Sequence, residues 1–193
     1  MSNVNKLIQK NKGYVTYDEL KESSVSYNTV KKMIDSGEII KEKPGIYRLP
    51  DTYIDEHFTL QHRYPKGIYT LETSLWLHGL SLTVPFEPVM SFPYGTNTKL
   101  IKDAGVKPII LRSYYDIGII NVATPGGQLV RVYEKERSLV ESLRPIYKMD
   151  VQAIAPAFKT YAARGKINYT KLLKYAKMFK VEEKIHSYLE VLG

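Results

Sequence analysis

The strongest constraint on the fold is a short helical pattern joined directly to a hairpin pattern within residues 26–50. The helix is predicted to begin at Ser26, whose hydroxyl can accept a hydrogen bond from a first-turn amide. It is predicted to end at Gly37, because glycine readily takes the left-handed conformation that closes helices. The hairpin follows at once, with apolar residues on both sides of a Lys43-Pro44-Gly45 turn.

The residues before Ser26 further restrict the folds that the chain can adopt. A first helix with a repeating apolar face ends at Gly13, and a brief extended run follows it. Thr16 and Glu19 then have the spacing of a capping box, which predicts a second helix. Helix, strand, helix, turn, helix and hairpin is the order of a winged helix-turn-helix domain, predicted here over residues 1–50. In such domains the second helix of the helix-turn-helix enters the major groove of DNA.

The predicted second helix of this pair has the side chains that such a role needs. Asn28 can bond the edge of an adenine, and lysines can neutralise phosphates or donate to guanine. The candidate DNA-binding residues are Tyr27, Asn28, Thr29, Lys31 and Lys32 on this helix, with Lys41, Lys43 and Arg48 around the wing. Two other interpretations stay open: a helical hairpin that only packs, or a winged helix that contacts protein.

Charge is distributed unevenly along the chain of 193 residues, whose net charge is +8. Residues 1–50 hold nine Lys or Arg against six Asp or Glu, and residues 146–193 hold nine against four. The stretch between them is balanced, with ten of each. This segregation indicates a polyanion contacted at two places, although a solvated helix face explains any single lysine.

The predicted C-terminal domain spans residues 51–193, which makes the fold class α+β. A mixed α/β core is expected to extend to about residue 145. Its predicted helices are 54–64, 71–79 capped by Thr70, and 134–144 with an ordinary ion-paired face; its predicted strands lie within 88–92, 107–114, 117–124 and 128–133.

Residues 146–193 are expected to be a basic helical segment. Its cations form a candidate second basic surface: Lys148, Lys159, Arg164, Lys166, Lys171, Lys174 and Lys177. Lys171, Lys174 and Lys177 recur every third residue and so gather along one side of a helix. Tyr161, Tyr169 and Tyr175 interleave with these bases. The surface is expected to contact either DNA, as an extension of the footprint of the first domain, or a partner protein; the alternative is a basic helix that is merely solvated.

Several classes of function are disfavoured. The chain has no cysteine, which excludes disulfides and thiolate metal sites. The four histidines are scattered, so we expect no metal, no cofactor and no catalytic residues. No apolar run resembles a signal peptide or a membrane span, so we expect a cytoplasmic protein.

Three segments carry a resemblance to a known family: GIYRLP at 45–50, LETSLWLHGLS at 71–81 and YEKERSLVESLR at 133–144. With the winged helix before them, they resemble the AbiEi antitoxins of AbiE-type abortive-infection toxin–antitoxin pairs. In the third segment Ser138 and Glu141 stand where Thr and Asp would be expected.

The resemblance implies a repressor of its own operon that binds inverted repeats in the promoter, with a C-terminal domain needed for antitoxicity. It also implies a nucleotidyltransferase toxin as functional partner, no stable complex with that toxin, as in type IV systems, and a role in phage defence. The alternatives are a DNA-processing enzyme targeted by the winged helix and a non-catalytic protein that docks a partner.

Overall fold

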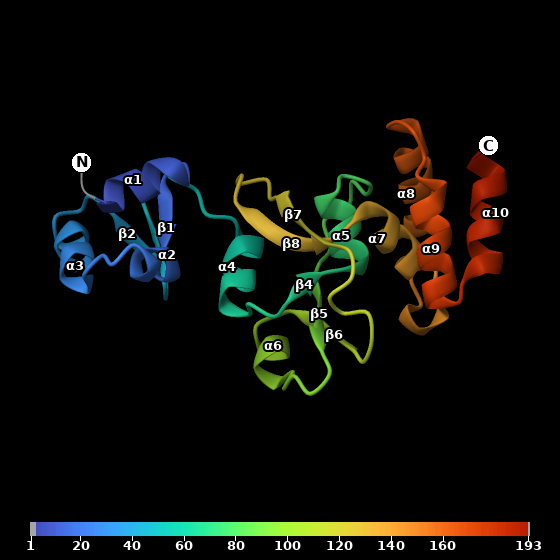
Figure 1. Ribbon diagram of the computed structural model, residues 1–193, viewed down its shortest axis with the longest axis horizontal. Coiled ribbons are helices and arrows are strands. Elements are labelled where there is room, and N and C mark those ends of the chain that lie inside the picture. Colours follow the sequence, from blue (N-terminus) through green and yellow to red (C-terminus); the bar gives the residue numbers. More distant parts are fainter. Residues whose placement is uncertain (1–2, 193) are drawn as a thin grey trace. The chain divides into compact units, whose positions relative to one another are not determined.

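The computed structural model describes residues 3–192 and divides the chain into two compact units (Figure 1). The first unit contains residues 1–60 together with the turn at 125–128, and the second contains the rest. Helix α4 (Glu56–Arg63) runs from the first unit into the second. The chain is a mixed α+β protein, as the sequence predicts.

The first unit opens with six short elements in quick succession. They are α1 (Asn3–Lys10), β1 (Tyr14–Thr16), α2 (Tyr17–Glu22), α3 (Tyr27–Asp35), β2 (Ile40–Lys43) and β3 (Ile46–Arg48). The strands form an antiparallel sheet in the order β1-β3-β2. The capping box of α2 is confirmed, because Thr16 accepts from the Glu19 amide and Glu19 accepts from the Thr16 amide.

The core of this unit is apolar and draws on every one of these helices. Its buried residues are Val4, Ile8, Val15, Leu20, Val30, Met33, Ile39 and Tyr47. Gly13 allows the chain to turn closely past this core, since its φ is +110° and a Cβ there would lie 2.1 Å from Thr52 Oγ1. A side chain at position 13 would therefore be both strained and obstructed.

The second unit contains a five-stranded mixed sheet in the order β6-β5-β4-β8-β7. Its strands are β4 (Ile68–Tyr69), β5 (Val89–Pro93), β6 (Lys107–Leu111), β7 (Ile119–Ala123) and β8 (Leu129–Tyr133). The four predicted strands are present, while the two-residue β4 and the helix α6 (Lys99–Asp103) were not predicted. Strand β4 is central because it pairs with β5 on one side and β8 on the other.

Helices make up the rest of this unit and enclose a second core. They are α5 (Leu71–Leu77), α7 (Lys135–Ser142), the 3₁₀ turn η1 (Pro145–Tyr147), α8 (Val151–Ala163), α9 (Tyr169–Phe179) and α10 (Glu182–Leu192). The core joins side chains of α5, α7, α8, α9 and α10, and Figure 1 shows the last three as neighbouring helices.

Two local predictions in this unit need correction. Thr70 precedes α5, but its side chain makes no capping hydrogen bond; its hydroxyl lies 3.5 Å from Glu141 Oε2 instead. The residues of α7 were expected to form an ordinary ion-paired face. Arg137 and Glu141 do form an ion pair, but the pair is not an ordinary surface one, because Arg137 is fully buried and Glu141 is 1% exposed. The helix is packed against α5, α8 and α9, so the side that carries these charges has no access to water.

The buried Arg137 is held by a specific set of partners. Its Nε lies 3.3 Å from Glu141 Oε2, and its Nη1 donates to the carbonyls of Tyr114 and Ile117. Its guanidinium carbon lies 3.3 Å from the ring centroid of Tyr133. Such a pair inside a core needs good geometry and added hydrogen bonds to offset the cost of removing two charges from water.

Candidate nucleic-acid interface

Helix α3 buries one side and presents the other to solvent. Val30 and Met33 are in the core of the first unit, while Asn28, Lys31 and Lys32 are exposed. Ser26 caps the helix as predicted, accepting a hydrogen bond from the Thr29 amide at 3.3 Å. Because no acidic residue lies in the first turn, its free amide groups and positive dipole end favour an anion.

The cations of this face are free to bind. Neither Lys31 nor Lys32 forms an ion pair with any residue in the described range 3–192. Thr29 is exposed, and its hydroxyl shares a 3.0 Å hydrogen bond with Ser26. The exposed face of α3 thus presents four groups that can bind a polyanion: the side-chain amide of Asn28, the hydroxyl of Thr29 and the ammonium groups of Lys31 and Lys32.

The cations of the β2–β3 hairpin are of two kinds, exposed lysines and an arginine that is already bonded within the protein. Lys41 and Lys43 are exposed on β2, where the register shifts between them. Arg48 behaves differently, because its Nε lies 2.6 Å from Glu42 Oε2 and its Nη1 donates to the carbonyls of Leu49 and Pro50. The structure therefore engages Arg48 in holding the hairpin to the chain that follows it.

Two exposed tyrosines lie at this surface, and the sequence singled out only one of them. Tyr27 is 56% exposed, and Tyr17, at the start of α2, is 48% exposed. Burial raises the pKa of the Tyr47 phenol, and the phenols of Tyr27 and Tyr17 raise it further. Tyr17 gave no separate signal because its position is explained by the helix start at Thr16.

All seven cations of the second basic surface are exposed in the second unit: Lys148, Lys159, Arg164, Lys166, Lys171, Lys174 and Lys177. Two of them already have partners, since Lys171 pairs with Glu134 and Arg164 Nη1 donates to the His78 carbonyl. Of the interleaved tyrosines only Tyr169 is exposed. Tyr161 and Tyr175 are buried and donate to Glu136 and Glu134.

The histidine and acidic side chains outside this surface do not form a cluster suited to metal binding: within the described residues 3–192 no three or more His, Asp or Glu side chains are placed to hold a metal ion. His78 is buried, which lowers its pKa, and its Nε2 lies 2.7 Å from the Tyr133 carbonyl. None of the helices in that part of the chain has the length and apolar character needed to span a bilayer.

The exposed face of α3, the free lysines and the adjoining hairpin all lie within one short segment. Residues 4–50 match the family model described as transcriptional regulator, AbiEi antitoxin. This AbiEi segment confirms the resemblance at the N-terminus, over less than half of the chain. The description of this family as antitoxin transcriptional regulators suggests a regulatory role for the AbiEi segment.

A solved structure resembles most of the chain in fold. The crystal structure of the RV2827C protein from Mycobacterium tuberculosis aligns with a TM-score of 0.51 over 90% of this chain and 69% of that chain. The two sequences are 12% identical over the alignment, so the likeness concerns the fold alone. No curated protein sequence matches the chain significantly.

Proposed function

We propose that the chain is a sequence-specific DNA-binding regulator whose first unit is a winged helix-turn-helix. In this proposal α2 and α3 form the helix-turn-helix, α3 enters the major groove, and the β2–β3 hairpin is the wing. The observation that carries the proposal is the exposed face of α3, where Asn28, Lys31 and Lys32 stand without ion-pair partners in the described range.

The proposed contacts divide into two kinds. Lys31, Lys32, Lys41 and Lys43 neutralise phosphates, and Tyr17 and Tyr27 donate to the backbone beside the helix N-terminus. Asn28 reads a base edge, and Thr29 contacts either a base or a phosphate. Arg48 has a supporting role in this scheme, because its guanidinium is already bonded to Glu42 and two carbonyls.

The biological role proposed for this regulator follows from the AbiEi segment. We propose that it represses its own operon through inverted repeats in the promoter and acts in the cytoplasm. The antitoxic activity is assigned to the second unit and is directed against a nucleotidyltransferase toxin, without a stable complex, in defence against phage. The family match supports a regulator of this kind rather than an enzyme.

The test is a gel-shift titration of the purified chain on its own promoter at several salt concentrations. Each phosphate contact that is lost should reduce the slope of log affinity against log salt by about 0.9. The double variant Lys31→Ala, Lys32→Ala should therefore bind more weakly and with a flatter salt dependence.

A matched control removes two exposed lysines outside the proposed interface, Lys99 and Lys102 on α6. The variant Lys99→Ala, Lys102→Ala should keep the affinity and the slope of the wild type. Equal losses for both double variants would show that general positive charge, rather than the α3 face, carries the binding.

A further inference from the structure

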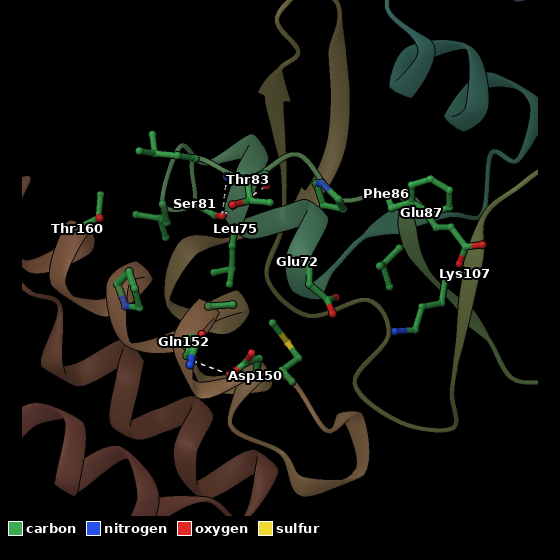
Figure 2. A pocket seen from close by; sticks show the side chains of 17 residues that line it. Glu72, Leu75, Ser81, Thr83, Phe86, Glu87, Lys107, Asp150, Gln152 and Thr160 are labelled. Carbon is green, nitrogen blue, oxygen red and sulfur yellow. Dashed lines mark hydrogen bonds between the residues drawn. The ribbon is translucent and has the colours of Figure 1, made fainter.

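A cavity of about 630 Å³ lies in the second unit (Figure 2). Its walls come from α5, the loop 81–87, the first residues of β5 and β6, and helix α8 with the residues just before it. Apolar side chains make up much of the lining: Leu75, Leu80, Val89, Met149, Ala153 and Pro156. A space of this size can hold several side chains of a partner.

The loop at the rim of the cavity exposes unusually large apolar groups. Leu82 is 98% exposed and Phe86 is 100% exposed, and both line the cavity. Val84 between them is 58% exposed. Single exposed apolar residues are ordinary, but a contiguous group beside a concave apolar surface marks an interaction site.

The charge of the lining is opposite to that of the chain. Three acids and one base line the cavity, namely Glu72, Glu87, Asp150 and Lys107, whereas the whole chain has a net charge of +8. Figure 2 shows Glu72 and Lys107 reaching into the space from different walls. A duplex would be repelled by this surface, and a cationic apolar segment would be attracted to it.

Glu72 adds a second reason for a cationic partner. Its Oε2 is buried and accepts no hydrogen bond from the described residues 3–192. A buried carboxylate oxygen without a partner destabilises the protein until a donor or cation approaches it. Asp150, in contrast, is already used at the same cavity, because it caps α8 by accepting from the Gln152 amide at 2.8 Å.

The chain itself displays a segment with the required chemistry. On α9, Tyr169 is 47% exposed and Leu173 is 41% exposed, and with Lys177 they stand four residues apart along one side of the helix. Lys174 lies beside them and is also exposed. Neither Lys174 nor Lys177 forms an ion pair within the described part of the chain.

We propose that this face of α9 docks into the acidic cavity of a second copy of the chain. Tyr169 and Leu173 cover Leu82 and Phe86 of the other copy, and Lys174 and Lys177 face its Glu72 and Glu87. Because each copy has one cavity and one α9, two identical contacts close a symmetric dimer. The dimer does not require DNA, so this proposal can be tested independently of the proposed DNA binding.

The first test removes the apolar part of the contact. Sedimentation velocity over a range of protein concentrations should show a monomer–dimer equilibrium for the wild type. The variant Leu82→Ser, Phe86→Ser should be monomeric, and its fold should be retained because both side chains are almost fully exposed. The control Leu100→Ser, Leu129→Ser changes two exposed leucines outside the cavity and should dimerise like the wild type.

The second test exchanges charges across the contact. Glu87→Lys alone and Lys174→Glu, Lys177→Glu alone should each raise the dimer dissociation constant at least about tenfold, since each homodimer would hold two repulsive contacts. Mixed together, the two variants should form a heterodimer. One of its contacts then has the native charges. In the other, the signs of Glu87 and of both lysines are reversed while Glu72 is unchanged, so that contact recovers the attraction at position 87.

The outcomes separate this proposal from its rivals. A heterodimer from the mixture, with both single variants weakened, supports docking of α9 into the cavity. A wild type that stays monomeric at every concentration overturns the proposal and leaves the cavity to a different protein partner. A wild-type dimer that the cavity variants do not weaken overturns it too, because the contact must then lie elsewhere.

Discussion

Helices α3 and α7 have similar lengths and both carry charged residues, yet they place those charges in opposite surroundings. On α3, Lys31 and Lys32 are exposed beside a small apolar face. On α7, every residue from Arg137 to Ser142 is buried, including an arginine and a glutamate. The comparison shows that the function of a charged helix depends on what packs around it rather than on its own pattern.

The physical difference lies in the number of neighbouring elements. Helix α3 borders a small three-stranded unit and buries only Val30 and Met33. Helix α7 is surrounded by α5, α8 and α9, so its polar side chains must find partners within the protein. Arg137 finds them in Glu141, two backbone carbonyls and the Tyr133 ring. Charge on α3 is available for binding, whereas charge on α7 fixes the core.

The largest expected effect comes from breaking the buried pair. Arg137→Met should lower the free energy of unfolding by about 3–5 kcal/mol, because Glu141 would lose its buried partner and keep only the more distant, partly exposed Arg144, at 3.7 Å, as a charged neighbour. Urea denaturation followed by circular dichroism measures this loss. Lys135→Met on the same helix is the control, since Lys135 is exposed and its removal should change stability by less than about 0.5 kcal/mol.

A double variant sharpens this prediction. Replacing both partners, Arg137→Met with Glu141→Leu, should recover part of the lost stability, because no unpaired charge is then left in the core. A double variant as unstable as the single one would mean that the cation–π contact and the bonds to the carbonyls, rather than the charge pair, dominate at this site.

A smaller effect, and one on binding alone, is expected on α3. Asn28→Ala should reduce discrimination between the promoter and unrelated DNA by roughly 1–3 kcal/mol, the size of one bidentate base contact. Because Asn28 is exposed, the urea midpoint should not move. Parallel titrations on the two DNAs measure the effect; equal losses on both would reassign Asn28 to the backbone.

The smallest effect is expected from the ion pair between Lys171 and Glu134, which is neither fully exposed like the lysines of α3 nor fully buried like the pair of α7. Burial by itself raises the pKa of Glu134, but hydrogen bonds from Lys171 and Tyr175 outweigh it and lower the pKa below the ordinary value of 4.5. The pair is partly exposed to solvent, so Lys171→Met should cost only about 0.2–1 kcal/mol near neutral pH.

The sign of the pH dependence follows from that lowered pKa. The unfolded chain binds the proton at higher pH than the folded chain, so this contribution is complete above about pH 4.5 and is lost as the pH falls through the folded pKa. Thermal melts of the wild type and of Lys171→Met should therefore converge in acid. Curves that stay parallel would show that the pair contributes nothing through Glu134 ionisation.

The first unit could be predicted well because its signals are local. Ser26, the Thr16–Glu19 capping box and Gly37 mark helix ends through bonds or dihedral angles that involve only nearby residues. The positions of Asn28, Lys31 and Lys32 followed from helical spacing alone. Tyr17 was missed because its influence on Tyr47 depends on how α2 packs in the unit, which its own position in the sequence does not indicate.

The second unit was harder to predict because its signals are distant in sequence. Arg137 bonds to carbonyls 20 and 23 residues away, and nothing in the pattern of residues 134–144 indicates that they are near. Strand β4 has two residues, too few for any alternation to be recognised. The cavity was equally hidden, since its lining comes from residues between 72 and 160.

The turn at 125–128 has a consequence for how this gene can be cut or fused. Gln128 accepts from the Asp55 amide and donates to the Tyr53 carbonyl, and Asp55 accepts from the Gly126 amide. A shortened gene product that stops at residue 60 would keep Tyr53 and Asp55 but leave these groups without their partners. The first sixty residues therefore do not contain every contact of the N-terminal unit. A natural or engineered fusion that carries only the first sixty codons would lack the turn at 125–128 and its hydrogen bonds.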